Sequence, residues 1–501
     1  MKKNFLIFIL ILPFLIISCE KSEIVEPEIE LNEFSILKEN NPAISQDFYG
    51  EISDDFIYLK CPGLEDLTQL IPTIEGEFQT IYIDGEQHVP NISEQDFSMP
   101  LTLELTYNNK SKTYTVFTQG YNLLPIVSIH TENGLPIESK TENIKADFTI
   151  FNALNHSNIL DAGKIKGRGN ATWNYAKKPY KIKFSEKQEP FGFKSNKDWV
   201  LLAEANDNSF LRTAFMCEVS KALEIPYTID FQHVDLYIND EYKGLYIFTE
   251  KVEEGKFRVN LDNDGFLFEK DTYYKDEPLY FTTDIFNQHF TFKYPDADNN
   301  DIVEGDENFN FINNFMNEVE RKILLLQEDS TSTLFEDMID IESFAKWYLA
   351  VEITGNFDPN IFYVLKNRKS KLQMYPLWDS EWSLGLYDLS WGLNITSDLS
   401  SHSIWERKYL FNCLFNSPIF RDEVKKQWNL FKNNSLELED KIDYYVESIK
   451  YAQETNKTLW TMPAGKKELL VKFENWEEEI NYVKNYYYNR IIFLNSYFTS
   501  L

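Results

Sequence analysis

The feature that most constrains the fold is a change of hydrophobic period along the chain. Between residues 34 and 117, short stretches alternate apolar and polar side chains and end in turn dipeptides such as Asp84-Gly85 and Asn108-Asn109. Such alternation before a turn is typical of strands. From residue 403 to the end, apolar side chains recur at helical spacing, over 418–431, 436–453 and 473–497. The sequence therefore predicts an α+β protein with an all-β part first and a helical part last.

The region between these parts mixes both periods. Strands are expected at 127–129, 180–184, 234–238 and 244–248, and helices at 209–223 and 341–353. The short strands before it indicate a small β-sandwich, and with no catalytic constellation in that part a spacer role is expected. We accordingly expect three folded segments: a β-sandwich at 34–120, a mixed domain at 124–400, and the helical C-terminal part of that domain at 401–501.

The first residues predict export and lipidation. Two lysines precede an apolar run over 5–17, which is too short to span a bilayer and is typical of a secretory signal. The run ends at Ser18-Cys19, with an aliphatic residue three positions before the cysteine, and so resembles a bacterial lipobox. A secretion signal with a chance cysteine and a single anchor helix are the alternatives. We expect a signal peptide at 1–18, lipidation at Cys19 and a flexible acidic tether at 19–33.

The residues after Cys19 indicate where the protein is located, and its net charge and cysteines indicate which partners and bonds to expect. The acidic start after Cys19 resembles signals that send some Gram-negative lipoproteins to the outer face of the outer membrane, so a lipid-anchored position in the cell envelope is expected. A formal net charge of −31 argues against nucleic acid as a partner, because phosphate binding needs a cationic face. Cys61, Cys217 and Cys413 show neither zinc nor disulfide spacing, so buried thiols are expected.

A glycine-rich segment is the first with chemical potential. Residues 166–173 read Lys-Gly-Arg-Gly-Asn-Ala-Thr-Trp, and the strand that follows carries Lys181 and Lys183 on one face. Two glycines around Arg168 let the backbone approach a ligand, and the amides of such a turn can cradle phosphate. A nucleotide site needs this combination of pliable loop and strand lysine. A Gly-Arg-Gly turn into an amphipathic edge strand explains the pattern at least as well.

Two acidic centres stand in otherwise apolar sequence further along. One is Asp358 with Asn360, the other is Asp379 with Glu381, and the residues between them are typical of a hairpin that would hold both loops at one end. Carboxylate and amide oxygens suit a hard cation such as Mg²⁺. Phosphoryl transfer needs one acidic residue near the attacking hydroxyl and a second that holds the metal. Asx-turns that cap a hairpin, or a structural Ca²⁺ site, are the alternatives.

Taken in order, these segments resemble the CotH (spore coat protein H) family of atypical protein kinases. The resemblance extends from about residue 124 to beyond residue 385, and it implies a reduced, two-lobed protein-kinase-like domain. It is carried by the glycine-rich segment 166–173, the Lys-Lys-Pro-Tyr-Lys-Ile-Lys strand 177–183, the Lys-Asp-Trp-Val-Leu-Leu segment 197–202, the Asn-x-x-Tyr-x-Gly-x-Tyr strand 239–246, and the Asn-x-Asp and Trp-Asp segments 356–358 and 378–379.

The resemblance implies a role for each acidic centre. Asp358 matches the family's catalytic aspartate, which would act as a base or orient the acceptor hydroxyl. Asp379 matches the metal-binding aspartate, and Asn360 would offer a nearby amide. Glu381 stands where many relatives carry Asp, so it would join the metal site or support it. The implied cofactors are ATP and Mg²⁺ or Mn²⁺.

The resemblance also implies a nucleotide site. Arg168 and either Lys181 or Lys183 would contact phosphates, and the choice between the lysines stays open. Glu250 ends a hydrophobic strand that, read alone, belongs to a β-hairpin with a solvated acidic end. In a kinase the hinge would follow this strand, so Val252 and its neighbours would flank the adenine.

Two functions compete at this point. One is a kinase that moves the γ-phosphoryl of ATP to Ser or Thr of a surface or secreted protein. The other is a catalytically degenerate surface module that binds a protein or glycan, with Trp378, Trp382 and Trp391 as stacking surfaces. Such aromatic residues more often belong to the core. The predicted location weakens the case for activity, because little ATP is present outside the inner membrane, but the kinase is the function that we expect.

Overall fold

The protein is described from a computed structural model. It covers residues 29–44, 46–53, 55–61, 67–97, 100–108, 110–119, 124–151, 158–389, 400, 403–406, 408–435, 437–461 and 468–501. The predicted signal peptide, Cys19, the tether up to residue 28 and Trp391 lie outside these residues. The chain divides into a first unit that ends at Thr118 and a second unit that is mainly Gln119–Leu501.

The first unit is built of strands that pair in the order β4-β1-β2-β3-β8-β7-β5-β6. The predicted alternation is clear in β7, where Leu101, Leu103 and Leu105 are buried and the residues between them are not. Strand β1 starts within the segment predicted as a tether, because Leu31 is already buried and paired with β4. The strands are β1 (Glu30–Ile36), β2 (Phe48–Ser53), β3 (Phe56–Lys60), β4 (Thr73–Glu77), β5 (Thr80–Ile83), β6 (Glu86–Gln87), β7 (Leu101–Tyr107) and β8 (Lys110–Gln119).

The second unit begins with a closed barrel. Its strands follow the order β10-β11-β12-β13-β15-β14-β9, and the parallel pair β9–β14 closes it. Apolar side chains such as Phe148, Ile182, Trp199 and Phe248 form its core. The four strands predicted in this region are confirmed. The barrel strands are β9 (Ile126–Thr131), β10 (Ile144–Phe151), β11 (Ile159–Gly167), β12 (Tyr180–Gln188), β13 (Asn196–Leu202), β14 (Phe231–Ile238) and β15 (Glu241–Glu250).

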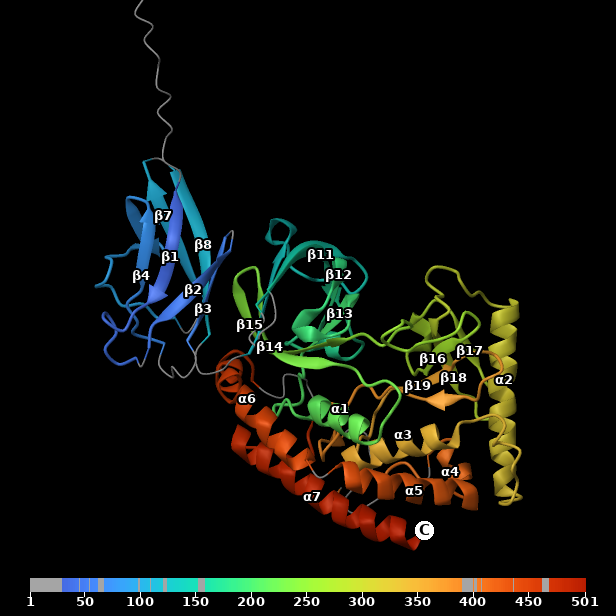
Figure 1. The fold of residues 1–501 in the computed structure, drawn as a ribbon. Coiled ribbons are helices and arrows are strands. Elements are labelled where there is room, and N and C mark those ends of the chain that lie inside the picture. Colours follow the sequence, from blue (N-terminus) through green and yellow to red (C-terminus); the bar gives the residue numbers. More distant parts are fainter. Residues whose placement is uncertain are drawn as a thin grey trace, which may run out of the picture. The chain divides into compact units, whose positions relative to one another are not determined.

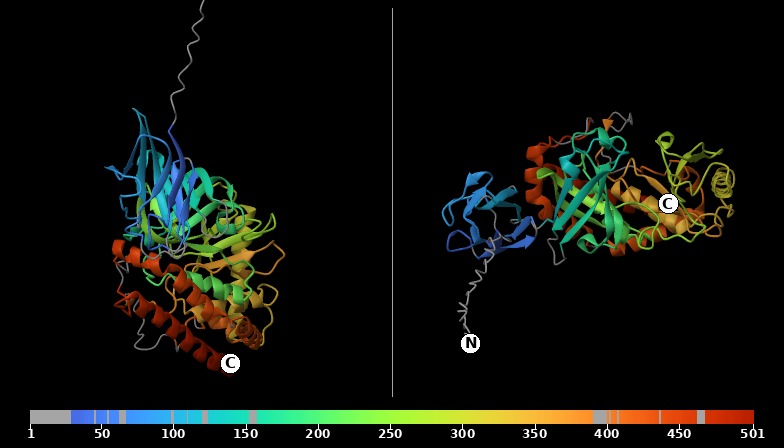
Figure 2. Two further views of the ribbon diagram at one scale, coloured as in Figure 1. Left: turned by 60° about the vertical axis from the view of Figure 1, so that its left-hand side comes forward. Right: turned by 90° about the horizontal axis from the view of Figure 1, so that it is seen from above.

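A second sheet of this unit, here called the C-terminal sheet, has the strand order β17-β18-β16-β19-β20. The predicted hairpin between the two acidic centres is confirmed as β19–β20, with Tyr363 opposite Met374. The barrel and the C-terminal sheet lie side by side (Figures 1 and 2). The strands of this sheet are β16 (Phe266–Lys270), β17 (Tyr280–Thr282), β18 (His289–Tyr294), β19 (Ile361–Leu365) and β20 (Gln373–Met374).

Helices form a layer across the barrel and the C-terminal sheet (Figure 1). Helix α3 is buried from Ser343 to Thr354, starts with an Asp340 cap on the Ser343 amide, and ends at Gly355, whose φ is 61°. The predicted helices are confirmed, and α2 is an addition to them. None of the helices in the residues described is long and apolar enough to cross a membrane. The helices are α1 (Arg212–Ala222), α2 (Glu307–Leu324), α3 (Ile341–Thr354), α4 (Phe411–Leu414), α5 (Pro418–Asn434), α6 (Leu438–Leu459) and α7 (Trp476–Ser500).

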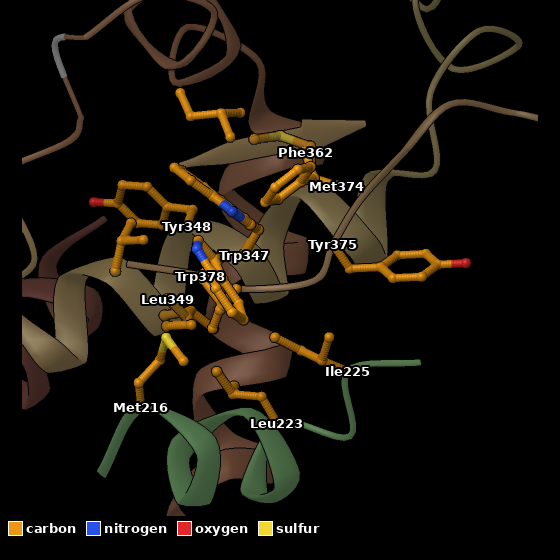
Figure 3. Close-up of a cluster of buried hydrophobic side chains, with 14 of the residues drawn as sticks. Met216, Leu223, Ile225, Trp347, Tyr348, Leu349, Phe362, Met374, Tyr375 and Trp378 are labelled. Atoms are coloured by element: carbon orange, nitrogen blue, oxygen red, sulfur yellow. The ribbon is translucent and has the colours of Figure 1, made fainter. Parts of the chain in front are cut away.

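One part of the main core fixes the loop that carries Asp379. Trp378 lies among apolar side chains of α1, α3 and the β19–β20 hairpin, including Met216, Trp347 and Phe362 (Figure 3). Because Trp378 is nearly covered by these neighbours, the residue that follows it has a defined position.

A buried ion pair joins α7 to α3. Arg490 and Glu352 are both fully buried and paired through their side chains, and Arg490 Nε also donates to the Glu352 carbonyl at 2.6 Å. The Glu352 carboxylate accepts from the Trp405 amide at 2.6 Å, and Trp405 Nε1 donates to the Asn356 carbonyl at 2.7 Å. The C-terminal helix is therefore linked to the loop that contains Asp358.

The cysteines behave as the sequence predicts. Cys61, Cys217 and Cys413 are buried and unpaired. Burial raises the pKa of Cys61 to about 12, so this thiol stays protonated and unreactive at neutral pH.

Candidate active site

A cavity of about 440 Å³ in the second unit brings the chemically interesting segments together. The barrel contributes residues 168–172 and 202–205, the C-terminal sheet contributes 269–273, and the loops around the hairpin contribute 357–361 and 378–382. The glycine-rich loop and both acidic centres, far apart in sequence, thus line one space. Its size is within the range that holds small-molecule ligands.

Asn356 holds the two acidic loops against each other. Its Nδ2 donates to the Asp379 carbonyl at 2.9 Å, and its Oδ1 accepts from the Asp358 amide at 3.0 Å. Asn356 is buried, whereas the Asp358 and Asp379 side chains are exposed to the cavity. The first residue of the Asn-x-Asp segment therefore positions the two carboxylates.

Asp379 occupies an electrostatically unusual place. Its φ is 61°, so the backbone adopts the left-handed conformation at a non-glycine residue. The cavity walls displace solvent around the carboxylate, and this burial, followed by the charges of Asp358 and Glu381, raises the pKa of Asp379 to about 7. Arg168 acts in the opposite direction. A cation near Asp379 would restore the carboxylate form.

Glu381 is held by the segment that follows β13. One Glu381 oxygen accepts from the Asn206 amide and the other accepts from Asn206 Nδ2 at 3.1 Å. Glu204 lies beside this pair and accepts from Thr213 Oγ1 at 3.0 Å. Burial, then the nearby Glu381 and Asp207 charges, raise the pKa of Glu204. Sequence reasoning missed Glu204 and Asn206, although both follow closely after the Lys-Asp-Trp-Val-Leu-Leu segment 197–202.

Arg168 reaches the cavity through its loop. Its guanidinium lies over the Trp378 ring, 5.5 Å from the ring centroid, and its amide donates to the Pro179 carbonyl at 3.2 Å. Gly169 has a φ of 86°, and a Cβ there would lie 2.1 Å from Thr172 Oγ1. Burial lowers the Arg168 pKa and the Asp379 charge opposes that shift, but an arginine stays charged. Because a side chain at position 169 would clash with Thr172, a glycine there is needed to hold Arg168 in this position.

Comparison with protein families identifies the family to which this chain belongs. The family described as CotH kinase protein matches residues 165–494. The chain belongs to the CotH kinase family. The match starts just before Arg168, includes Asp358 and Asp379, and runs into α7. A search of curated proteins found no match. Membership implies a kinase-like function, with ATP and a divalent metal as general requirements.

The donors in the CotH cavity suit a hard divalent cation. Asp379 offers a carboxylate, and Asn360 offers its amide oxygen because Asn360 Nδ2 donates to Glu269. Both are oxygen donors of the kind that Mg²⁺ and Mn²⁺ prefer. Across the part of the chain that the structure covers, no three His, Cys, Asp or Glu side chains are grouped to hold a metal. A cation held by Asp379 and Asn360 would take one or two protein ligands and complete its shell with phosphate and water.

The structure does not bring Lys181 and Lys183 to this cavity. Both ammonium groups lie on the outer face of the barrel, where they pair with Asp198 at 3.1 and 3.4 Å. The predicted alternation along β12 is correct, but its apolar face, Tyr180 and Ile182, points into the barrel core. The lysine face therefore lies on the outside of the barrel.

Glu250 and Val252 are also outside the cavity lining. The Glu250 carboxylate is buried and accepts from Tyr227 Oη at 2.9 Å and from the Asp230 amide at 3.0 Å. Arg258 Nε lies 3.7 Å from its second oxygen. These contacts give Glu250 a structural role at the end of β15, in place of the solvated strand end that the sequence alone suggests.

The aromatic side chains near the acidic loops belong to the interior. Trp378 and Trp382 are 8% and 7% exposed, so their faces are not open to a sugar ring. Each packs in an apolar cluster, Trp378 in the main core and Trp382 with Leu386 and Leu469.

Proposed function

We propose that this CotH-family protein is an atypical protein kinase that transfers the γ-phosphoryl group of ATP to Ser or Thr of a surface or secreted protein. The transfer would require Mg²⁺ or Mn²⁺. The observation that carries the proposal is the convergence of Asp358, Asp379 and Arg168 on one cavity, although they come from three separate loops. We further propose that a lipid on Cys19 anchors the protein to the outer membrane.

Each acidic loop has a separate task in this proposal. Asp379, with the Asn360 amide, would hold the divalent cation. When bound, that cation supplies charge neutralisation for the phosphates. Asp358 is exposed to the cavity and would orient the acceptor hydroxyl. As the new oxygen–phosphorus bond forms and the bond to the β-phosphate oxygen breaks, Asp358 would take the hydroxyl proton and ADP would leave.

The other walls of the cavity suit the rest of the nucleotide. Arg168 and the backbone of its glycine-rich loop would bind phosphate oxygens, because a guanidinium and exposed amides both donate to anions. Among the apolar side chains that line the cavity, Leu202 of β13 is partly exposed and offers a wall for the base, whereas Met216 and Ile229 are buried. This wall takes the place of the adenine contact expected near Val252.

Phosphate transfer from labelled ATP tests the proposal. Wild-type protein lacking the signal peptide should label a cell-surface extract in the presence of Mg²⁺ or Mn²⁺. Asp358→Asn and Asp379→Asn should each lower the rate at least about 100-fold, as expected for removal of a group that acts on the transition state. Asp422→Asn is the matched control, because Asp422 is an exposed carboxylate on α5, outside the cavity lining. Equal labelling by the cavity variants and the control, with all proteins folded, would contradict the proposal.

The anchor has its own test. Cells fed labelled palmitate should label the protein, and Cys19→Ser should abolish the labelling. Labelling that persists in Cys19→Ser would show that the lipid is elsewhere.

A further inference from the structure

The cations that line the cavity differ in how far they are already paired. Among the residues the structure covers, these cations are Arg168, Lys270 and Lys293. Lys293 Nζ forms an ion pair with Glu269 at 3.0 Å. Arg168 lies over Trp378, with the Asp379 and Glu269 charges acting on it. Within the same part of the chain Lys270 has no ion pair within 4.0 Å, and its Nζ lies 5.7 Å from the centroid of the Tyr409 ring.

Strand pairing places Lys270 beside the Asp358 loop. Strand β16 runs antiparallel to β19, and Lys270 stands directly opposite Ile361, three residues after Asp358. Lys270 is half-buried, and it lines the cavity together with Asp358. Burial lowers the pKa of Lys270 and the charge of Asp358 opposes that shift, so the two groups are within electrostatic reach.

This position complements the divalent-cation site. The cation would be held by Asp379 and Asn360. The negative charge of the phosphoryl group near Asp358 would then be balanced by a protein side chain. A transferring phosphoryl group spreads its charge over three oxygens, and an ammonium group can donate to them from a flexible stem. Among the described residues that line the cavity, Lys293 is committed to a carboxylate pair, whereas Arg168 and Lys270 are not, and Lys270 is the one that stands beside the Asp358 loop.

We propose that Lys270 binds the phosphoryl group during its transfer from ATP to the acceptor hydroxyl, and so acts as a catalytic residue next to Asp358. This inference rests on the proposed kinase function. It assigns to the C-terminal sheet the phosphate-binding lysine that the sequence places on β12. The role differs from that of Arg168, which would bind phosphates from the barrel side before and after transfer.

Steady-state kinetics with two synthetic acceptor peptides, one neutral and one acidic, test this role. Lys270→Ala should lower kcat at least about 10-fold for both peptides, while KM for ATP and the affinity for ADP change little, because the contact forms during transfer. Lys270→Arg should restore part of kcat, since it returns a positive charge and donors. Lys369→Ala is the control, because Lys369 is exposed at the turn of the β19–β20 hairpin, outside the cavity lining.

Three results would overturn the inference, each in a distinguishable way. If Lys270→Ala keeps the kcat of Lys369→Ala while wild-type protein transfers phosphate, Lys270 has no catalytic role and the kinase function stands. If the loss is confined to KM for the acidic peptide, Lys270 instead binds an acidic acceptor. If wild-type protein transfers no phosphate to any acceptor, the proposed function fails and this inference fails with it.

Discussion

Gly169→Ala offers the sharpest local test of how the glycine-rich loop works. The φ of Gly169 is +86°, and the added Cβ would lie 2.1 Å from Thr172 Oγ1. The left-handed backbone alone costs an L-residue about 1–2 kcal/mol. The clash adds to this cost and forces the loop to move, which displaces Arg168 from its place over Trp378.

Gly305→Ala separates backbone strain from the clash. Gly305 has a φ of +82°, and nothing lies within 4 Å of the position that an added Cβ would take. Gly305→Ala should therefore lose about 1–2 kcal/mol of unfolding free energy in urea, followed by tryptophan fluorescence, and Gly169→Ala should lose at least as much. Only Gly169→Ala should also weaken Mg-ATP binding, by about 10-fold, which corresponds to about 1.4 kcal/mol for a displaced phosphate ligand.

A double variant completes this test. Adding Thr172→Ala to Gly169→Ala removes the Oγ1 that the new Cβ meets, so ATP affinity measured by calorimetry should recover in part while the strain cost stays. Equal ATP affinity in Gly169→Ala and Gly305→Ala would refute the reasoning, because it would show that the loop position does not matter for the nucleotide.

Two further predictions concern stability. Arg490→Met should lower the unfolding free energy by about 3–5 kcal/mol, because it leaves the fully buried Glu352 carboxylate without its cation; urea titration measures this, and a loss below about 1 kcal/mol would contradict it. The Arg490→Met/Glu352→Gln double variant should recover part of the loss. His233 is buried and its ring Nε2 lies 2.9 Å from the Phe210 carbonyl; burial lowers the pKa of His233 from 6.5 to about 4. Its neutral form therefore stabilises the fold fully above pH 6.5, and about 3 kcal/mol is lost as the pH falls from 6.5 to 4, since only the unfolded chain binds the proton in that window. His233→Gln should lack this part of the acid-induced loss in urea titrations at several pH values; an unchanged pH profile would contradict the assignment.

Local patterns predicted much of the fold. Strand-like runs of apolar residues identified β12, β14 and β15, and helical spacing identified α3, α5, α6 and α7. The closure of the barrel was not predictable, because it depends on the parallel pairing of β9 with β14, which are more than 90 residues apart. Nothing in either segment alone specifies that partner.

The candidate site was predictable where chemistry and local geometry coincide. Asp358 and Asp379 stand at the two ends of a short hairpin, so their common placement follows from adjacent sequence. The lysines of β12 show what the local sequence does not determine. Alternation puts Lys181 and Lys183 on one face, but only the closed barrel decides that this face is the outer one. Lys270 carries no motif, and only the register of β16 against β19 places it near Asp358.

Transfer from ATP labelled at either end of the triphosphate tests the central claim most directly. Wild-type protein with Mn²⁺ and a surface extract should incorporate label from γ-labelled ATP and none from α-labelled ATP, and Asp379→Asn should lose the γ-label while keeping its fold. Incorporation from α-labelled ATP would identify nucleotidyl transfer in place of phosphoryl transfer. Full γ-labelling by Asp379→Asn would contradict the account, because it would show that the transfer does not depend on the cavity.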